Sequence, residues 1–261
     1  MPGRRGIDAD QGSVTPVREA VDTAGIIYQM DRHGMQTVDR LREIAFFQDL
    51  DANQLALLAR EARVKVFRPG EIIVSQEEPV RAFYLVLSGQ VKIYRSSAEG
   101  KEQTLYLFGP GEPFCLCAAF EEQGYPANAA ALESSEIVIL PGRTFENLAR
   151  EAPSLIFPML LVLSRRLKES MQLVETLSLK ELPQRVATFL LHAAPRVADG
   201  ETLDIRLPLT HRELAKMLGA TPEGLSRVFK RLQNRGLVSV NGRAIRVHDR
   251  AGLERLSHGV E

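Results

Sequence analysis

A segment near the C-terminus constrains the fold of this chain more than any other part of the sequence. Thr210 and Glu213 have the spacing of a capping box, which predicts the start of a helix. Gly219 lies where that helix should end, because glycine adopts the left-handed conformation without a Cβ penalty. Thr221 followed by Pro222 predicts the start of a second helix. The segment therefore predicts two short helices joined by a tight turn.

The second of these helices has an apolar face and a polar face at helical spacing. The apolar face contains Leu225, Val228, Phe229 and Leu232. The polar face contains Glu223, Ser226, Arg227 and Lys230. A DNA-recognition helix requires an apolar face packed on a scaffold and a polar face that meets base edges. The alternative is an ordinary helical hairpin with a solvated charged face.

The residues that follow favour the DNA-binding interpretation. Two alternating segments, Leu237–Val240 and Arg243–Val247, flank the dipeptide Asn241-Gly242. Asn-Gly between alternating segments predicts a two-residue β-hairpin turn, since glycine and asparagine tolerate positive φ. Two helices followed by such a hairpin form a winged helix. We expect Asn241 and Arg243, at the tip of this wing, to reach DNA phosphate.

The charge distribution supports the same interpretation. The chain has 33 basic and 33 acidic residues and is neutral as a whole. From Leu182 onward there are 13 Lys and Arg residues against 8 Asp and Glu residues, which leaves 20 basic and 25 acidic residues in the part before it. A basic C-terminal part joined to an acidic part indicates that only the C-terminal part meets nucleic acid.

The middle of the chain predicts a β domain. Short apolar or alternating segments are separated by Gly and Pro turn signals. These segments are Val64–Phe67, Ile72–Val74, Ala82–Leu87, Gln90–Tyr94, Thr104–Phe108, Ala129–Leu132 and Glu136–Leu140. Seven or eight strands of this length predict a small antiparallel barrel or jelly roll. The chain as a whole is therefore expected to be of the α+β class.

A long helix is predicted after the β domain, over residues 158–179. Apolar residues recur there at spacings of three or four: Leu160, Leu163, Leu167, Met171, Val174 and Leu177. A seam of this length favours pairing with a partner helix, and a dimer is what a reader of palindromic DNA requires. The alternative is a helix packed only on its own barrel.

These patterns divide the chain into four parts. We expect an N-terminal tail over residues 1–40, an effector-sensing barrel over 41–152, a dimerisation helix and hinge over 153–181, and a DNA-binding domain over 182–261. The sequence has no run of 18 apolar residues and no secretory signal, so we expect a cytoplasmic protein that does not enter a membrane. No nucleophile–base constellation indicates an enzyme.

Over residues 41–247 the chain resembles the CRP/FNR transcription regulators. The resemblance rests on Arg68–Glu71, Tyr84–Val91, Phe108–Glu112 and the block from Leu209 to Leu237. It implies a homodimer on a palindromic DNA site and contact with RNA polymerase. Glu223-x-x-Ser226-Arg227 is similar to the FNR branch, in which these residue types read the half-site.

The resemblance also implies contacts to the DNA backbone. It assigns such contacts to Thr210 and His211. We expect Thr221, Lys230, Asn241 and Arg243 to add others.

The chain departs from this family in the part of the barrel that senses the effector. Cyclic-nucleotide-binding members hold the phosphate with an arginine, but no Lys or Arg occurs between Lys101 and Arg143. A buried phosphate without a cation would be poorly compensated, so we expect no cyclic AMP binding. The N-terminal segment has no cysteine, which excludes the iron–sulfur cluster of FNR.

In the same part of the barrel, Phe114-Cys115-Leu116-Cys117 is similar to the Phe-Cys-Met-His segment of the CO sensor of this family, with Cys115 matching its Cys and Cys117 replacing its His. There the Cys and the His bind haem iron, and an N-terminal proline, like Pro2 here, is the other ligand. The resemblance therefore implies haem b as cofactor, with nitric oxide or carbon monoxide as the signal. The chain also resembles the HcpR and Dnr regulators of nitrosative stress.

Three alternatives remain open for this segment. Cys115 and Cys117 are small buried hydrophobes on one face of a strand, or they form a thiol redox pair. In the third, the barrel belongs to a cyclic-nucleotide-type regulatory subunit of an enzyme, although such a subunit would not carry the winged helix.

Overall fold

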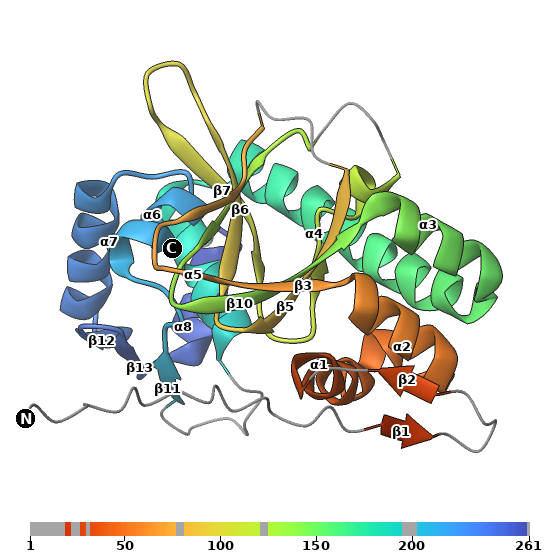
Figure 1. Cartoon of the computed structure of the whole chain (residues 1–261). Helices are drawn as coiled ribbons and strands as arrows, with labels where there is room; N and C mark the ends of the chain where they lie inside the picture. Colours follow the sequence, from red (N-terminus) through yellow and green to blue (C-terminus); the bar gives the residue numbers. More distant parts are fainter. Residues whose placement is uncertain are drawn as a thin grey trace, which may run out of the picture.

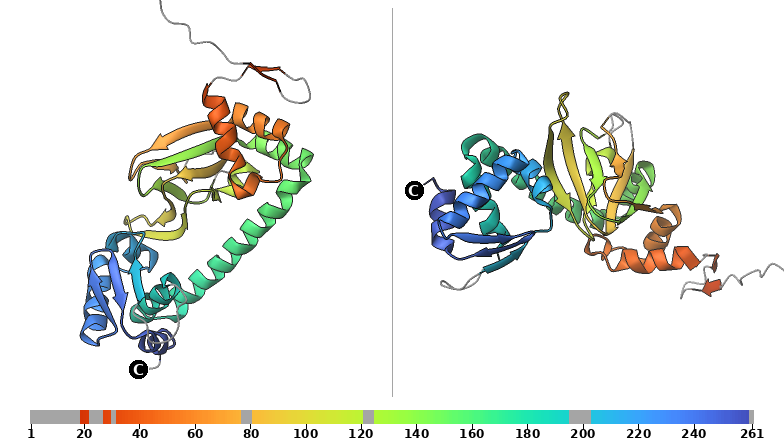
Figure 2. Two further views of the ribbon diagram at one scale, coloured as in Figure 1. Left: turned by 90° about the horizontal axis from the view of Figure 1, so that it is seen from below. Right: turned by 90° about the vertical axis from the view of Figure 1, so that its left-hand side faces the viewer.

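A sheet domain and a helical domain lie side by side and are joined by one long helix, α4 (Ile156–Leu179), which Figure 2 shows along its length. The computed structural model describes residues 19–21, 27–29, 32–76, 81–120, 125–194 and 203–259. Figure 1 shows the sheet domain in the middle and the DNA-binding elements predicted from the sequence on the left.

The sheet domain consists of two four-stranded antiparallel sheets. The first has the order β3 (Arg63–Phe67), β10 (Ser135–Pro141), β5 (Ala82–Ser88) and β8 (Pro113–Phe114). The second has the order β4 (Ile72–Val74), β9 (Asn128–Ala131), β6 (Val91–Ser96) and β7 (Glu102–Phe108). Apolar side chains from both sheets, including Tyr84, Ile93 and Phe114, form the core between them. The jelly roll predicted from the sequence is confirmed.

Helices cover the outer face of the first sheet. They are α1 (Arg32–Arg42), the short turn η1 (Ala45–Phe47), α2 (Ala52–Glu61), α3 (Gly142–Glu151) and the turn η3 (Pro153–Leu155). Phe83 of β5 stacks on Phe145 of α3 with ring centroids 4.1 Å apart, so aromatic packing fixes α3 on the sheet. Before α1, the segments β1 (Glu19–Val21) and β2 (Ile27–Gln29) pair antiparallel, whereas the sequence predicts a tail without strands here.

The helical domain is a winged helix with two additional elements. It contains α5 (Leu182–Ala193), β11 (Leu203–Arg206), α6 (His211–Met217), α7 (Pro222–Asn234), β12 (Val238–Asn241), β13 (Ala244–Val247) and α8 (Arg250–Ser257). The strands form one sheet of order β11-β13-β12. The predicted helices and hairpin are confirmed. Strand β11 and helix α8, which the sequence analysis does not predict, complete the sheet and the core.

The turn of the wing is one residue later than predicted. Asn241 pairs with Ala244, so Gly242 and Arg243 are the two central residues. Gly242 has a φ of +56°. Glycine at the first central position is typical of a type II′ turn, so the asparagine belongs to the strand and the glycine alone provides the positive φ.

Candidate functional site

Helices α6 and α7 begin and end where their capping residues place them. Thr210 Oγ1 accepts a hydrogen bond from the backbone N–H of Glu213 at 3.2 Å. Thr221 Oγ1 accepts one from Gly224 N at 3.1 Å, and Gly219 has a φ of +63° just after α6. The predicted capping box is only half formed, because the Glu213 carboxylate binds lysines instead of the backbone N–H of Thr210.

The polar face of α7 is exposed as predicted for a reading helix. Glu223, Ser226, Arg227 and Lys230 are all solvent-exposed. The opposite face is buried and contains Leu225, Val228, Phe229 and Leu232. This apolar face packs in the same core as α6 and α5, so α7 presents its polar side chains on a rigid support.

The residues expected to contact the DNA backbone lie around this face. Thr210, Thr221, Asn241 and Arg243 are exposed. His211 differs from the expectation, because its ring lies against Phe229 with centroids 5.1 Å apart and its Nε2 atom is buried without a hydrogen-bond partner. Because Nε2 is buried, that atom cannot contact a phosphate. In this arrangement the His211 ring packs against Phe229 of α7.

Hydrogen bonds fix the wing relative to α7. Gln233 Oε1, near the end of α7, accepts a hydrogen bond from Val240 N of β12 at 2.9 Å. Arg246 of β13 donates to both carboxylate oxygens of Asp204 on β11, at 2.7 and 2.9 Å. These bonds hold the pKa of the exposed Asp204 carboxyl below its usual value. The wing and the reading helix therefore form one rigid unit.

The predicted seam of α4 lies on the surface of the single chain. Its exposed members are Leu160, Leu163, Leu167, Met171 and Val174, with exposures of 57, 48, 64, 67 and 65%. No residue of α4 is buried among the described residues. A helix packed only on its own barrel would bury such a stripe, so that alternative is wrong for these residues.

The two cysteines do not lie on a strand, contrary to the expectation of neighbours on one strand face. Cys115 precedes a 3₁₀ helix, η2 (Leu116–Ala119), which contains Cys117. Cys115 has a φ of +52°, an unfavourable conformation for a residue with a Cβ atom. It is buried, whereas Cys117 is exposed, so the turn separates the environments of the two thiols.

Burial determines the chemistry of Cys115. Desolvation raises the pKa of its thiol well above the usual value, and the neighbouring Cys117 acts in the same direction. A hydrogen bond with Tyr125 opposes this rise. Burial also raises the pKa of the Tyr125 hydroxyl. Cys115 is therefore a neutral thiol in an apolar environment.

A cation from α4 reaches the same side of the barrel. The Arg166 guanidinium lies over the ring of Phe108, and its side chain is only 17% exposed. It forms ion pairs with Glu112 at 3.1 Å and with Glu169 at 2.7 Å. Arg166 lies on α4, outside the stretch between Lys101 and Arg143 that has no Lys or Arg.

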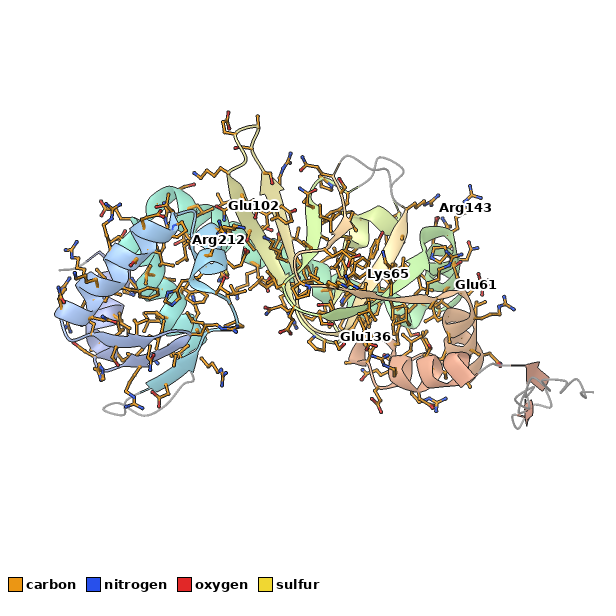
Figure 3. The ribbon with its side chains drawn as sticks, turned by 60° about the vertical axis from the view of Figure 1, so that its left-hand side comes forward. Glu61, Lys65, Glu102, Glu136, Arg143 and Arg212 are labelled. Atoms are coloured by element: carbon orange, nitrogen blue, oxygen red, sulfur yellow. The ribbon has the colours of Figure 1, made fainter. Side chains whose placement is uncertain are left out.

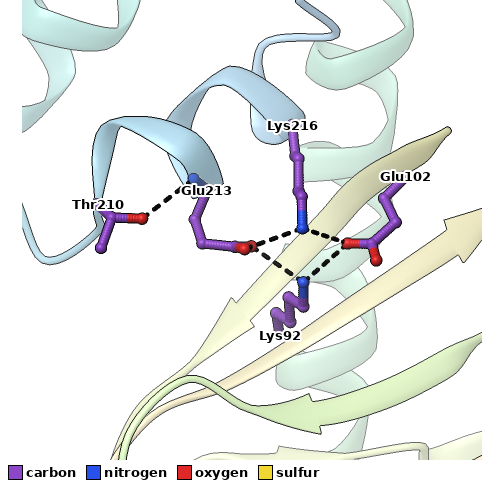
Figure 4. A network of polar contacts seen from close by, with 5 residues as sticks. All are labelled: Lys92, Glu102, Thr210, Glu213 and Lys216. Atoms are coloured by element: carbon purple, nitrogen blue, oxygen red, sulfur yellow. Dashed lines mark hydrogen bonds and ion pairs between the residues drawn. The ribbon is translucent and has the colours of Figure 1, made fainter. Parts of the chain in front are cut away.

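The two domains meet through charged side chains of β6, β7 and α6, which we call the interdomain charge cluster. It contains Lys92, Glu102, Glu213 and Lys216, and each lysine contacts both carboxylates (Figure 4). Figure 3 labels Glu102 of β7 and Arg212 of α6 on the two sides of this junction. The sequence analysis does not predict any of these contacts between the domains.

Arg185 of α5 connects α5 to the ends of α4 and α6. Its guanidinium donates to three backbone carbonyl oxygens, those of Lys180, Leu218 and Leu177, at 2.9, 3.0 and 3.0 Å. One side chain thereby joins the ends of α4 and α6 to α5. Lys180, in the segment 153–181 expected as dimerisation helix and hinge, takes part in this contact.

The described residues contain no group of three or more His, Cys, Asp or Glu side chains arranged to hold a metal ion. None of their helices combines the length and the apolar character needed to cross a bilayer. Pro2, the other expected haem ligand, lies outside the described residues.

Two family comparisons match the two domains. Residues 64–152 match the cyclic nucleotide-binding domain family. Residues 184–256 match the Crp-like helix-turn-helix domain family.

Individual relatives extend over most of the chain. The cyclic AMP receptor protein of Thermus thermophilus is 32% identical over 214 residues, which cover 82% of this chain and 97% of the relative. The transcriptional activator protein Anr of Pseudomonas aeruginosa is 30% identical, with 76% of this chain and 81% of the relative covered. A solved structure of a CooA mutant from Carboxydothermus hydrogenoformans aligns with a TM-score of 0.70 at 26% identity, covering 82% of this chain and 95% of that one.

Proposed function

The chain belongs to the CRP/FNR family of transcription regulators, and from this premise we propose that it acts as a homodimer on palindromic double-stranded DNA. It is a DNA-binding regulator and not an enzyme. The observation that carries the proposal is the combination of an exposed polar face on α7 with an exposed apolar seam on α4. We further propose that it acts in the cytoplasm together with RNA polymerase.

The seam explains how two reading helices are brought together. Pairing of two α4 helices about a two-fold axis would bury the exposed leucines and Met171 against their counterparts. A two-fold dimer presents its two α7 helices to half-sites about 34 Å apart, one turn of the DNA helix. The symmetry of the protein would then match that of a palindrome.

Within each half-site we propose that Arg227, Ser226 and Glu223 read the bases. An arginine fork matches the O6 and N7 atoms of guanine, and a carboxylate accepts a hydrogen bond from N4 of cytosine. Thr210, Thr221, Lys230, Asn241 and Arg243 would contact the backbone around them.

For the signal we propose haem-bound nitric oxide or carbon monoxide, received at the barrel segment around η2, and not cyclic AMP. A cyclic nucleotide phosphate would need a free cation. Arg166 is close to the barrel, but two carboxylates, Glu112 and Glu169, already neutralise it. Among the named relatives, the Thermus protein is a cyclic AMP receptor. We propose that this chain differs from it in ligand, because no Lys or Arg occurs between Lys101 and Arg143.

The two cysteines differ in how well they suit a haem. Cys117 is exposed, so we propose it as the residue that would hold the iron. Cys115 does not, because its thiol is buried in the core, neutral and hydrogen-bonded to Tyr125. When bound, the haem would supply an iron that takes up a diatomic gas. The protein itself would provide the sulfur of Cys117.

One observation favours a second candidate, a thiol redox switch. Both cysteines belong to one short turn, Cys115 directly before η2 and Cys117 within it, so the spacing imposed by a strand does not apply to them. Oxidation by a peroxide or disulfide reagent would join them and change the shape of η2. This candidate requires both cysteines, whereas haem ligation requires only one.

Two measurements test the proposal. Sedimentation of the purified chain with a palindromic duplex selected from random DNA should give two chains for each duplex. The visible absorption spectrum with added haem should show a Soret band that shifts with nitric oxide or carbon monoxide. A complex with one chain per duplex would contradict the dimer, and absence of haem uptake would remove the haem.

A further inference from the structure

Strand β7 contacts the long helix α4 at one end and the DNA-binding domain at the other. At one end the Tyr106 hydroxyl is hydrogen-bonded to Ser170 Oγ of α4, and Phe108 lies under Arg166. At the other end Glu102 binds Lys216 of α6, and Gln103 Nε2 donates to the backbone carbonyl of Met217 at 3.0 Å. One strand of the sensing domain therefore touches both elements that a DNA-binding dimer must place correctly.

The interdomain charge cluster is the polar centre of this contact. Lys92 Nζ lies 3.0 Å from Glu102 Oε2 and 3.0 Å from Glu213 Oε2. Lys216 Nζ lies 2.6 Å from Glu102 Oε2 and 3.0 Å from Glu213 Oε1. The two positive and two negative charges alternate, so every contact among the four side chains is attractive (Figure 4).

The cluster is shielded from water. Lys92 is only 7% exposed, and its ammonium group also lies over the ring of Tyr94 at 4.5 Å from the centroid. Burial acts to raise the pKa of Glu102, but the hydrogen bonds from Lys216 and Lys92 outweigh it, so the pKa lies below the usual value. Loss of one member leaves two partly buried like charges sharing a single partner of opposite charge, so each contact in the cluster depends on the others.

The cluster fixes the position of α6 without covering the reading surface. Glu213 and Lys216 point from α6 to the barrel, whereas Glu223, Ser226, Arg227 and Lys230 on α7 stay exposed. Helix α6 packs in one core with α7, so a fixed α6 fixes α7. The docked arrangement is therefore compatible with DNA binding.

From these observations we propose that Lys92, Glu102, Glu213 and Lys216 are positioning residues for DNA reading, through which the barrel sets the orientation of each reading helix. The inference rests on the proposed palindrome reading by α7. A fixed orientation of the reading helices raises the DNA affinity of a dimer, because its two helices must contact both half-sites at one spacing and one relative rotation. Without the cluster, each reader would be held by the α4–α5 connection, the Arg185 contacts and the Gln103–Met217 hydrogen bond, and would lose more orientational entropy on binding.

Binding of DNA to full-length variants tests this inference. The variants are Glu102→Gln, Lys216→Met and the double variant, with Glu99→Gln as the matched control. Glu99 is an exposed carboxylate in the turn between β6 and β7, outside the cluster. The probes are a palindromic duplex selected by the wild-type chain, a duplex with a single half-site, and the palindrome with one base pair inserted between its half-sites.

We expect each single variant to bind the palindrome about five- to tenfold more weakly than wild type, and the double variant to be no weaker than the more severe single variant. Affinity for the single half-site should stay within about twofold, which also reports that the reader is folded. The inserted base pair rotates one half-site by roughly 35° relative to the other. The inserted base pair should therefore lower the DNA affinity of wild type by a larger factor than that of the variants. Destabilisation of the protein fold alone would not produce this difference.

The opposite results would overturn the inference. If Glu102→Gln and Lys216→Met keep both the palindrome affinity and the spacing selectivity of wild type, the cluster does not position the reader. The same conclusion follows if Glu99→Gln has an equal effect, since a general change of charge would then explain the data. An Arg227→Ala variant separates the two proposals, because unchanged binding there would refute the reading helix itself.

Discussion

The guanidinium carbon of Arg166 lies 4.1 Å from the centroid of the Phe108 ring, so a cation of α4 covers an aromatic ring of β7. The same side chain is paired with Glu112 and Glu169. Guanidinium groups favour this combination of stacking and ion pairing because they are planar and weakly hydrated. The contact fixes the middle of the long helix α4 to the sensing barrel.

Replacing this arginine should loosen α4 from the barrel. We expect Arg166→Met to lower the free energy of unfolding by about 1–3 kcal/mol, because stacking and both ion pairs are lost from a largely buried position. Urea unfolding followed by circular dichroism measures the change. Arg165→Met is the matched control, since Arg165 is the exposed neighbour on the same helix. Equal effects of the two variants would show that the contact with Phe108 adds nothing.

Base reading and phosphate contact should be separable on α7. Arg227→Ala should cost about 1–3 kcal/mol per half-site and relax the preference at one G·C pair. Lys230→Ala should weaken binding to all sequences and reduce the slope of log K against log salt by about 1. Titrations of selected and scrambled duplexes at several salt concentrations measure both effects. Retention of sequence preference by Arg227→Ala would contradict the assignment of the reading face.

A charge in the α4 seam should separate the dimer. Leu167→Glu places two like charges opposite each other in an interface that excludes water, and we expect a monomer that no longer binds the palindrome tightly. Leu163→Glu should act in the same way. Analytical ultracentrifugation at micromolar concentration gives the mass. Lys168→Glu, an exposed position beside the seam, should remain dimeric; a dimer of Leu167→Glu would place the interface elsewhere.

Single cysteine variants should distinguish the proposals for the sensor. If Cys117 holds a haem iron, Cys117→Ala should shift the Soret band of the haem-loaded protein while Cys115→Ala should not. A thiol switch would instead be lost in either variant, measured as the loss of an oxidant-induced change in DNA affinity. Calorimetry with cyclic AMP should give no binding signal, and saturable binding at micromolar affinity would contradict the proposed difference in ligand.

The interdomain charge cluster should respond to acid. The pKa of Glu102 is lowered in the folded protein, so its contribution to stability is present above the usual value of 4.5 and disappears as the pH falls through the lowered pKa. Lys216 has a raised pKa, so its contribution disappears only on the alkaline side, above the usual 10.5. The difference in melting temperature between wild type and Glu102→Gln should therefore be constant near neutral pH and vanish in acid. A difference that persisted well below pH 4.5 would show that charge is not its origin.

Much of the fold follows from patterns that are local in the chain. Thr210, Gly219 and Thr221 specify the ends of two helices, because a cap requires only residues within one turn of each other. The alternation of the strands and the seam of α4 are equally local, and the two-sheet domain and the long helix are both found where they are predicted. The family and its DNA-binding function could be predicted for the same reason.

The contacts between elements were decided by the tertiary structure alone. Lys92 and Glu213 lie 121 positions apart in the chain, and no local pattern indicates that they meet. Arg166 contacts the barrel although it belongs to α4. The Glu213 carboxylate pairs with two lysines and does not form the expected helix cap. Cys115 lies in a left-handed turn although its neighbours suggest a strand. Local propensity depends on neighbours in sequence, whereas burial and charge pairing depend on neighbours in space, and only the folded chain brings those together.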